Sequence, residues 1–362
     1  MPRGMVVSVL PKAVYNENQE IKMKAIRIHE FGGPEVLKHE DIPEPVLRKD
    51  HVLVRVRACA LNHLDLWVRK GLPGVQLPHI LGSDIAGEVV EFGEYITDLN
   101  EGARVLLAPM VFCNHCEHCN QGRHNFCPQF AVLGNGVDGG NCELIAVPRV
   151  NVIPIPDTLD FVQAASVPLV FLTAWHMLLG RAQLRAGQTV LVLGAGSGVG
   201  SAAIQISKML SAYVITTAGD ERKLERAREL GADYTINHYE QKIGDEVRRI
   251  TNKRGVDIVF EHVGQATWKE SLKSLKHGGT LVTCGATTGY EGNLDLRFLF
   301  SRQLSVLGSY MGAMGELDEV LKHVFAGKLR PVVDRAFPLS ETRAAHEYLA
   351  SSEQFGKVVV VP

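Results

Sequence analysis

Strand-like and helix-like segments alternate through the middle of the chain, between residues 189 and 310. Short apolar runs such as TVLVLG, AYVITT, VDIVFEHV and TLVTCG are separated by longer amphipathic runs such as VGSAAIQISKML and ERKLERARELG. The apolar residues of the longer runs recur with a period near 3.6, which is typical of helices. Such alternation indicates βαβ units, in which crossover helices join parallel strands. We therefore predict an α/β fold with a doubly wound parallel sheet in this part of the chain.

A glycine-rich turn joins the first of these strands to the helix that follows. The turn contains Gly194, Gly196, Ser197, Gly198, Val199 and Gly200. Small residues let the backbone approach a pyrophosphate, and the helix N-terminus offers free N–H groups and the positive end of its dipole. The spacing departs from G-x-G-x-x-G, because Val199 stands at the sixth position. Tight packing alone would also favour small residues here, but the strand–turn–helix context predicts dinucleotide binding.

The residues after the second strand bear on whether the cofactor carries a 2′-phosphate. An acidic residue at this strand end would bind the ribose 2′-hydroxyl and repel a phosphate. Here the strand ends near Thr217, and Arg222 and Lys223 follow closely. Asp220 lies between Thr217 and Arg222 and is well placed to cap the next helix. The hydroxyl and cationic side chains favour NADPH, with NADH as the alternative.

The rest of the chain has a different pattern. From Met23 to about Val150, short strands such as MKAIRIHE and HVLVRVRACALN are broken by glycine and proline, which predicts a mostly-β, barrel-like domain. The tail ends in the strand-like run KVVVV, which could return to complete that domain. We predict a disordered or loosely packed extension at 1–22, a β-rich domain at 23–170, a dinucleotide-binding domain at 171–316 and a returning tail at 317–362.

Four of the seven cysteines lie in one short run within a predicted lobe at about 108–130. The run is Cys113-x2-Cys116-x2-Cys119-x7-Cys127. Four thiolates can close on one tetrahedral Zn²⁺ and leave no position for water or substrate, so we expect one structural zinc per subunit. An iron–sulfur cluster is an alternative that the seven-residue final gap disfavours. The histidines within the run, His115, His118 and His124, are expected to be exposed residues of the lobe.

Composition excludes several classes of function. Lys and Arg number 38 and Asp and Glu 40, a net charge of −2, and no long basic run occurs, so nucleic-acid binding has little support. No apolar stretch reaches the roughly 18–20 residues needed to span a bilayer. The remaining cysteines, Cys59, Cys142 and Cys284, are scattered singly, unlike a secreted disulfide framework. We expect a cytoplasmic protein that binds neither nucleic acid nor membranes.

Together these features resemble the medium-chain dehydrogenase/reductase superfamily, which includes the zinc alcohol dehydrogenases and the zeta-crystallin-like quinone reductases. The resemblance covers nearly the whole chain from Met23 onward. It implies a GroES-like, mostly-β catalytic domain, a Rossmann domain, and a homodimer or homotetramer. The superfamily's structural-zinc lobe has the same cysteine spacing, which carries over one for one to Cys113, Cys116, Cys119 and Cys127.

The catalytic-zinc pattern of the zinc alcohol dehydrogenases does not carry over. Asn62 stands at the position of their ligand cysteine, and the motif G-H-E-x-x-G appears here as GSDIAG, with Ser83 and Asp84 in place of His and Glu. The third ligand position falls near Leu169. These replacements resemble the quinone-reductase and enoyl-reductase branch, which has no catalytic zinc. In that branch a lysine at the position of Lys223 contacts the 2′-phosphate, and many members have tyrosine where this chain has His238.

The expected activity is hydride transfer from NADPH to a quinone or an activated C=C bond, such as an enone or enoyl thioester. These substrates delocalise the developing negative charge and have less need of a Lewis acid. Asn62 is the candidate hydrogen-bond donor to the substrate carbonyl or the cofactor, and Thr173 is a candidate for proton delivery. Glu261 and His262, at a strand end, could line the nicotinamide pocket or serve packing.

Two alternatives remain open at the level of sequence. One is an alcohol dehydrogenase whose catalytic metal site is rebuilt from Cys59, His63, Asp65 and Asp84. Otherwise Cys59 is expected to be a buried, apolar-like residue and Asp65 a structural ion-pair partner. The other alternative is a non-catalytic NADPH-binding redox sensor.

Overall fold

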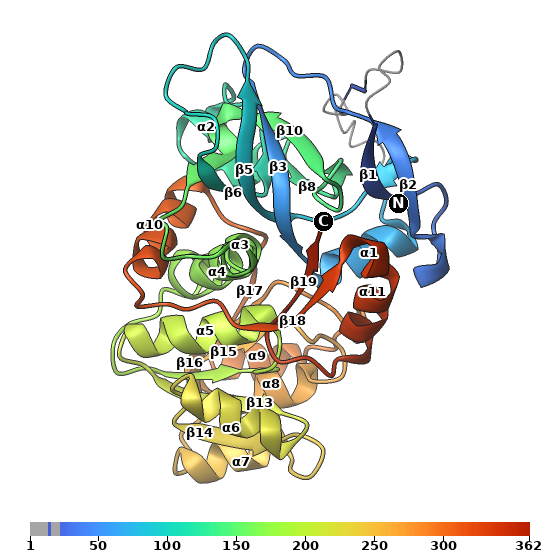
Figure 1. The fold of residues 1–362 in the computed structure, drawn as a ribbon. Helices are drawn as coiled ribbons and strands as arrows, with labels where there is room; N and C mark the ends of the chain where they lie inside the picture. The colour runs from blue at the N-terminus through green and yellow to red at the C-terminus, as the bar shows by residue number, and fades with distance from the viewer. Residues whose placement is uncertain (1–13, 16–21) are drawn as a thin grey trace. The chain divides into compact units, whose positions relative to one another are not determined.

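The computed structural model describes residues 14–15 and 22–362, and the predictions for 1–13 and 16–21 lie outside the described residues. The chain divides into two compact units (Figure 1). The first comprises Met1–Leu169, Ala313–Gly315 and Pro331–Pro362, and the second comprises Val170–Gly312 and Glu316–Arg330. No helix in the described part of the chain is long and apolar enough to cross a membrane.

The first unit is built mainly from β-strands. They are β1 (Lys22–Ile28), β2 (Lys38–Pro43), β3 (His51–Ala60), β4 (His79–Ile80), β5 (Asp84–Phe92), β6 (Arg104–Leu107), β7 (Met110–Val111), β8 (Ala131–Leu133), β9 (Gly136–Val137), β10 (Leu144–Pro148), β11 (Val152–Pro154), β18 (Val333–Pro338) and β19 (Lys357–Val361). The helices are α1 (His63–Gly71), α2 (Glu117–Asn120), α3 (Phe161–Ala165) and α11 (Thr342–Ser351). Helix α4 (Pro168–Trp175) crosses from the first unit into the second.

The largest sheet of this unit has seven strands centred on β3. Its order is β11-β6-β5-β3-β19-β18, with β10 also pairing with β3. The middle of β3 shows why it forms a strand, because Val54 and Val56 are buried while Arg55 and Arg57 alternate with them on the exposed face. Strands β2-β1-β4 and β7-β8-β9 form two smaller sheets. The main core lies against β3, β5 and β10.

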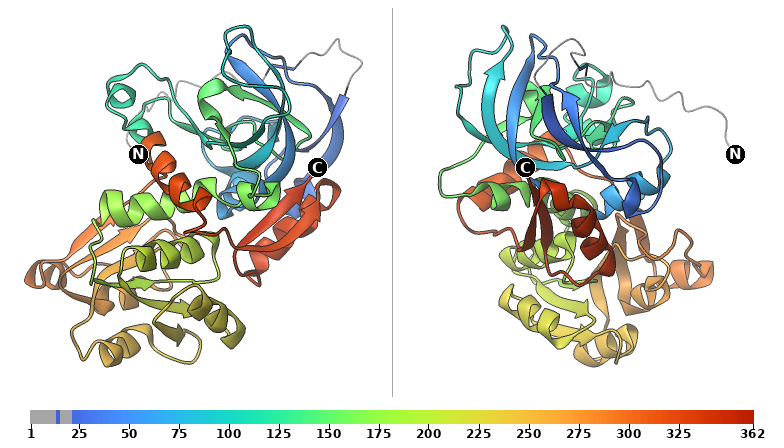
Figure 2. Two further views of the ribbon diagram at one scale, coloured as in Figure 1. Left: turned by 60° about the vertical axis from the view of Figure 1, so that its left-hand side comes forward. Right: turned by 45° about the vertical axis from the view of Figure 1, so that its right-hand side comes forward.

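The end of the chain returns to this unit. Strand β19 pairs with β3 in antiparallel fashion, with Val359 opposite Ala60 and Val360 opposite Cys59. Figure 2 shows the red C-terminal strands beside the blue strands of the same unit. At the start of β19, the ammonium of Lys357 donates to Oδ1 of Asn62, which lies just beyond the end of β3. The pairing therefore brings together residues that are far apart in the sequence.

The second unit contains a six-stranded parallel sheet, as predicted. Its strands are β12 (Thr189–Val192), β13 (Tyr213–Ala218), β14 (Tyr234–Asn237), β15 (Val256–Glu261), β16 (Leu275–Thr283) and β17 (Ser305–Gly308). Its helices include α5 (Gly198–Met209), α6 (Glu221–Glu229), α7 (Ile243–Ile250), α8 (Trp268–Ser274) and α9 (Leu296–Ser301), together with most of α10 (Met314–Phe325).

The strand order β14-β13-β12-β15-β16-β17 is that of a doubly wound sheet, and every neighbouring pair is parallel. The six residues of β15, VDIVFE, are all buried, as expected for a central parallel strand covered on both faces. Most of α10, which we grouped with the returning tail, belongs to the second unit. Its apolar residues Leu317 and Val320 are buried there.

Part of the N-terminal extension is docked on the first unit. Tyr15 forms a β-bridge with Pro45, and its hydroxyl donates to Asp138 Oδ2 at 3.0 Å. The other oxygen of Asp138 accepts from the backbone N–H of Ile80 at 3.0 Å. Tyr15 therefore differs from the disordered or loosely packed extension that we expected at 1–22.

Candidate active site and metal centre

The predicted catalytic residue Asn62 lies at the junction between β3 and α1, where it is the N-cap of the helix. Its backbone N–H donates to Asp65 Oδ2 at 2.7 Å, half of the reciprocal pattern known as a capping box. The other Asp65 oxygen accepts from the backbone N–H of Gly82 at 2.9 Å. Our expectation that Asp65 is an ion-pair partner is therefore wrong, because its carboxylate instead accepts backbone N–H groups.

Burial dominates the protonation behaviour of Asp65, whose side chain lies inside the first unit. Loss of solvation raises the pKa of Asp65 to about 6, against the lowering effects of its two backbone N–H donors and of Lys357.

A buried ion pair lies beside Asn62. The ammonium of Lys357 donates to Asn62 Oδ1 at 2.6 Å and to Asp84 Oδ2 at 2.8 Å. The amide nitrogen of Asn62 donates to the same Asp84 oxygen at 3.0 Å. The side chains of Lys357 and Asp84 are 3% and 0% exposed. Asn62 is thus engaged at both ends of its amide by a lysine and an aspartate.

The three positions at which we looked for catalytic-metal ligands lie around this ion pair. Asn62 is bonded to both partners, and the backbone N–H of Leu169 donates to Asp84 Oδ1 at 2.7 Å. Ser83 precedes Asp84 in the chain, and its buried hydroxyl has no hydrogen-bond partner among the described residues. An amide, a hydroxyl and a leucine form a weak donor set for zinc, which prefers cysteine, histidine and carboxylate.

The alternative metal site from Cys59, His63, Asp65 and Asp84 is not assembled. Cys59 is fully buried, and burial together with the charges of Asp65 and Asp84 holds the pKa of its thiol well above the ordinary value. It is therefore the buried, apolar-like residue that we expected. Within the described ranges, one group of three or more potential ligands has its donor atoms within 4.8 Å of one another, and that group is the cysteine run.

Sequence reasoning missed Lys357. A single lysine at the start of KVVVV reads as an exposed strand end, and lysine is almost never fully buried unless it is paired. The available signal was Asp84, because a buried carboxylate in a chain without the usual metal ligands beside it predicts a buried cation as its partner. The lysine that supplies it is 273 residues further along the chain.

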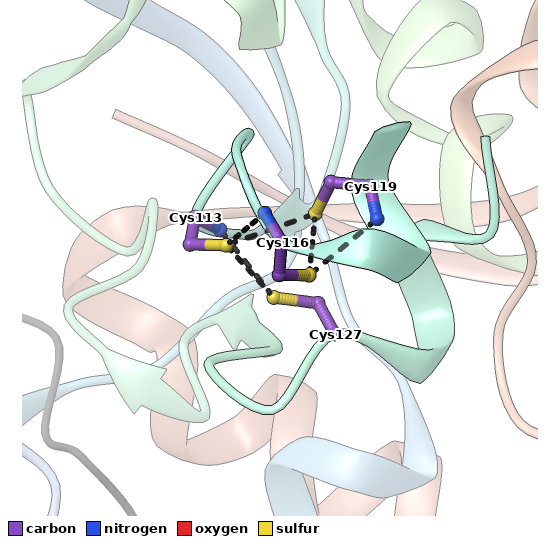
Figure 3. A group of neighbouring side chains, drawn as sticks. All are labelled: Cys113, Cys116, Cys119 and Cys127. Atoms are coloured by element: carbon purple, nitrogen blue, oxygen red, sulfur yellow. Dashed lines mark hydrogen bonds between the residues drawn. The ribbon is translucent and has the colours of Figure 1, made fainter. Parts of the chain in front are cut away.

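The four cysteines of the predicted lobe converge, and Figure 3 shows their sulfur atoms turned toward one another. The Sγ–Sγ distances are 3.5 Å for Cys116–Cys119, 3.6 Å for Cys113–Cys127 and 3.9 Å for Cys113–Cys119. Four ligands each about 2.3 Å from a tetrahedral zinc would be about 3.8 Å apart. The backbone N–H of Gln129 also donates to Cys127 Sγ at 3.3 Å. The donor chemistry and the spacing therefore fit a zinc ion.

The histidines of the lobe lie outside this group of sulfurs. His115 is exposed, as expected, and its Nδ1 lies 2.7 Å from the carbonyl oxygen of Cys113. His118 and His124 are half-buried, contrary to expectation. His124 packs against Phe112 with a ring separation of 4.3 Å and accepts a hydrogen bond from Met314 N at 3.3 Å. Its role in the structure is to hold the lobe against the start of α10.

In the second unit, the glycine-rich turn is held together by Ser197, the N-cap of α5. Its hydroxyl accepts from Gly200 N and donates to Gly194 O, both at 2.9 Å. Gly194 has a φ of +61°, which favours glycine. A Cβ on Gly200 would lie 2.3 Å from Gly194 O. Val199 at the irregular position of the motif is half-buried in the first turn of α5. The turn therefore requires glycine at two positions and presents the N-terminus of α5.

Thr217, at the end of β13, supports the same turn. Its side-chain oxygen accepts from the backbone N–H of Gly194 at 3.1 Å. The residue is only 2% exposed. Thr217 therefore positions the turn from the neighbouring strand.

The predicted 2′-phosphate residues gather where β13 and β14 end. Asp220 is the N-cap of α6, as expected, and accepts from the backbone N–H of Lys223 at 2.9 Å. Arg222 is exposed in the first turn of that helix, and Lys223 is half-buried. Burial and the nearby charge of Lys223 lower the pKa of His238, so this ring is neutral at pH 7. The turn and this cluster lie on neighbouring strands of one sheet.

Glu261 has a structural role in the loop that follows β15. Its carboxylate accepts from the backbone N–H groups of Val263 and Gly264 at 2.7 and 3.0 Å. It also accepts from the hydroxyls of Thr267 and Ser271. These bonds fix the loop that leads into α8.

His262 contacts the glycine-rich turn. Its Nε2 lies 2.8 Å from Leu193 O and 3.3 Å from Ser197 Oγ. Burial lowers the pKa of His262, so the neutral ring donates to the Leu193 carbonyl. His262 therefore sets the shape of the turn.

Thr173, the candidate for proton delivery, is buried in α4 and belongs to the second unit. Asn62 belongs to the first unit. After α4 the helix continues as a π-helical segment (His176–Arg181). There His176 Nδ1 lies 2.8 Å from Glu316 Oε1.

Comparison with known proteins gives matches in both units. Residues 48–157 match the alcohol dehydrogenase GroES-like domain, and residues 198–326 match the zinc-binding dehydrogenase family. A crystal structure of an NAD-dependent alcohol dehydrogenase is 43% identical, with a TM-score of 0.91, and the match covers 94% of this chain and all of that one. The chain belongs to the medium-chain dehydrogenase/reductase superfamily.

Two further members carry different names. The quinone oxidoreductase of Homo sapiens is 29% identical over 349 residues, which cover 94% of this chain and 98% of the human protein. A cobalt- and zinc-bound alcohol dehydrogenase from Pyrobaculum aerophilum is 32% identical, with a TM-score of 0.86, and the match covers 94% of this chain and 100% of that one. This medium-chain dehydrogenase/reductase is thus an NAD(P)-dependent oxidoreductase that acts on small molecules, with relatives named for both quinones and alcohols.

Proposed function

We propose that this medium-chain dehydrogenase/reductase transfers hydride from NADPH to a quinone or to an activated C=C bond, without a catalytic zinc. The observation that carries the proposal is the bonding of Asn62. At the position of a ligand cysteine the chain has an amide whose two ends are bonded to Lys357 and Asp84. An alcohol or simple aldehyde needs a Lewis acid for its developing alkoxide, whereas a quinone or enone delocalises that charge.

The chain's own residues then orient the reactants and exclude water. Asn62 was expected to donate to the substrate, but its amide N–H group donates to Asp84 within the unit. Its role in the proposal is therefore to shape the wall of the site. Thr173 remains the proposed hydroxyl for proton delivery.

NADPH is the proposed cofactor. The N-terminus of α5, with Gly194, Gly196, Ser197, Gly198, Val199 and Gly200, would hold the pyrophosphate. Lys223 and His238 lie near each other beyond β13 and β14, and with Arg222 they would hold the 2′-phosphate. The buried Thr217, which we expected to bind the cofactor, would instead act through the turn that it supports. Asp220 caps α6 through Oδ1, and its Oδ2 lies 3.8 Å from Lys223 Nζ, so a 2′-phosphate would share Lys223 with this carboxylate.

We also propose one structural Zn²⁺ per subunit, held by Cys113, Cys116, Cys119 and Cys127. The support is the spacing of their sulfur atoms. The ion would brace the lobe and take no part in hydride transfer, because four protein thiolates leave no open position. A cytoplasmic location and assembly into a homodimer or homotetramer are further proposals, the first supported by cysteines that form no disulfide among the described residues.

The test is an NADPH-oxidation screen over quinones, enals and enoyl-CoA thioesters, beside NAD(P)⁺ reduction by primary and secondary alcohols. We expect turnover with at least one member of the first group and at least 100-fold lower kcat/KM for every alcohol. Alcohol oxidation at a rate equal to or above the best reduction would overturn the proposal.

A second candidate is an alcohol dehydrogenase, and the 43% identity to a structure of that name favours it. It requires a catalytic metal in addition to the ion of the lobe. Metal analysis separates the two candidates, since one zinc per subunit supports the reductase and two support the dehydrogenase. A third outcome, tight NADPH binding without any turnover, would indicate a redox sensor.

A further inference from the structure

Helix α10 is shared between the two compact units, because Met314 belongs to the first unit and Glu316 to the second. The first unit holds the beginning of the helix. The backbone N–H of Met314, in the first turn where helices lack internal acceptors, donates to Nδ1 of His124 at 3.3 Å. His124 packs against Phe112 and lies three residues before Cys127. The start of α10 is therefore attached to the cysteine lobe.

The second unit holds the next two turns of α10. Oε1 of Glu316 lies 2.8 Å from Nδ1 of His176, the first residue of the π-helical segment that follows α4. Seven residues further along α10, the ring of His323 lies 5.6 Å from that of Trp175, the last residue of α4. Seven residues make about two helical turns, so both contacts lie on one face of α10. The helix is therefore attached to α4 and to the segment after it.

Glycines border the contact between Glu316 and His176. A Cβ on Gly180 would lie 2.6 Å from Glu316 Oε1 and 2.6 Å from His176 Nδ1. A Cβ on Gly312 would lie 3.0 Å from Glu316 Oε2. The glutamate is thus packed closely against backbone on both sides, and close-packed regions of a protein transmit strain. A shift at the start of α10 therefore reaches the π-helical segment.

We propose that α10 transmits the zinc state of the cysteine lobe to the segment after α4. With zinc bound, the chain around Cys127 is ordered, His124 fixes Met314, and the helix holds Glu316 against His176. Without zinc the lobe loosens, because a structural zinc contributes directly to the folding of the residues that bind it. The start of α10 then loses its attachment to His124. The proposal rests on the zinc site proposed above and gives that ion a regulatory role in addition to bracing the lobe.

The consequence for the enzyme is that metal supply acts on α4. Thr173, the proposed hydroxyl for proton delivery, lies three residues before His176 in a continuous run of helix. A helix end that loses a packing contact opens more often, since local opening depends on the contacts that hold each segment. Loss of zinc is therefore expected to loosen the end of α4 without any contact between the ion and the substrate.

Hydrogen exchange measured by mass spectrometry in peptides that cover residues 176–184 tests this link. The full chain is compared as zinc-loaded wild type, chelator-stripped wild type, and zinc-loaded His124→Ala and His118→Ala, with the zinc content of each form measured. Stripped wild type and His124→Ala are expected to exchange at least about fivefold faster in this segment than zinc-loaded wild type. His118→Ala changes another half-buried histidine of the lobe and should match wild type. His124→Asn keeps an acceptor close to the position of Nδ1 and should restore most of the protection.

Two results of this comparison would overturn the proposal. One is exchange at the wild-type rate in both the stripped protein and His124→Ala. The other is equal acceleration in His118→Ala and His124→Ala, which would mean that any disturbance of the lobe has the same effect. A wild-type chain that binds no zinc would remove the zinc site and this proposal together, whereas a zinc-binding chain without a change in 176–184 would remove the link alone.

Glu316→Ala tests the same link from the other end and leaves the residues of the lobe unchanged. It should accelerate exchange in 176–184 while the zinc content stays at the wild-type level. Stripping the zinc from this variant should then add less than about twofold, because two changes that act through one contact are not additive. A further acceleration as large as in wild type would show that the effect of zinc does not pass through Glu316, and the proposal would be wrong.

Discussion

The carboxylate of Asp65 accepts the backbone N–H of Gly82 at 2.9 Å, which ties the first turn of α1 to the segment before β5. The same side chain accepts from Asn62 N at 2.7 Å, so one carboxylate fixes both segments that carry the residues around Lys357. Because Asp65 is buried, its pKa is raised to about 6. This combination gives a specific dependence of stability on pH.

Asp65→Asn is expected to change how stability varies with pH. In the wild-type protein the folded state keeps the Asp65 proton up to about pH 6, whereas the unfolded chain releases it near its ordinary value of about 3.9. Between these values the folded state binds more protons, so this group's contribution to stability falls as pH rises and is constant above about pH 7. The asparagine of the variant does not titrate in this range. The free energy of unfolding of wild type should therefore exceed that of Asp65→Asn by an amount that shrinks by about 2 kcal/mol between pH 4.5 and 7.5. Urea unfolding at each pH measures it.

The control for this prediction is Asp318→Asn, which changes an exposed carboxylate on α10. It should give a difference from wild type that varies by less than about 0.5 kcal/mol over the same range, as for most exposed substitutions. A deficit of Asp65→Asn that grows with pH would mean that the Asp65 carboxylate is stabilised in the folded state, contrary to the raised pKa.

Removing one sulfur from the lobe should release its metal. Cys127→Ser replaces a thiolate that lies 3.6 Å from Cys113 Sγ with a much weaker zinc ligand. We expect zinc content to fall from one per chain to below about 0.2 and the melting temperature to fall with it, since a structural zinc contributes directly to folding. Cys284→Ala, in the second unit, is the matched cysteine control and should retain the zinc. Full zinc content in Cys127→Ser would show that the ion is bound elsewhere.

The residues at the ends of β13 and β14 should determine which cofactor is preferred. Lys223→Ala removes the cation that lies close enough to His238 to lower its pKa. We expect KM for NADPH to rise about tenfold, the loss of one charge-assisted contact worth roughly 1.4 kcal/mol, with KM for NADH nearly unchanged. Arg228→Ala removes a cation from the same helix that is paired with Glu221, and it should leave both KM values within about twofold. Equal effects of Lys223→Ala on both cofactors would exclude a role at the 2′-phosphate.

The fold could be predicted where the signal is local. Each βαβ unit of the second unit lies in one continuous stretch of sequence, in which strand-like apolar runs alternate with amphipathic helix-like runs. The cysteines of the lobe are likewise within 15 residues of one another in the chain. Ser197 and Asp220 could likewise be read as caps because their partners are three residues away. The site in the first unit is different, because Lys357 and Asn62 are 295 residues apart. Only the pairing of β19 with β3 brings them together, and no local pattern encodes that pairing.

Asp65 shows a second limit of sequence reasoning. Its place three residues after Asn62 fits a capping box, yet an aspartate near a lost metal site also suggests an ion pair. Which of these two roles Asp65 has depends on its burial and on Gly82, whose backbone N–H donates to the second oxygen of the Asp65 carboxylate. For Glu261 the same holds, since the loop after β15 has to fold before its N–H groups can meet the carboxylate.

The glycine-rich turn offers a matched pair of substitutions. Gly200→Ala would put a Cβ 2.3 Å from Gly194 O, a contact that only a shift of the turn can relieve, because the atom is backbone. The strain should reduce stability by about 1–3 kcal/mol, as for other overpacked positions. It should also weaken NADPH binding at least tenfold, because the displaced turn no longer presents the N–H groups of α5. Gly315→Ala, in α10, has nothing within 4 Å of the added carbon and should be neutral or stabilising by up to about 1 kcal/mol. NADPH fluorescence titration and thermal unfolding of both variants measure these effects. If Gly200→Ala binds NADPH as tightly as Gly315→Ala, the turn is not the pyrophosphate site.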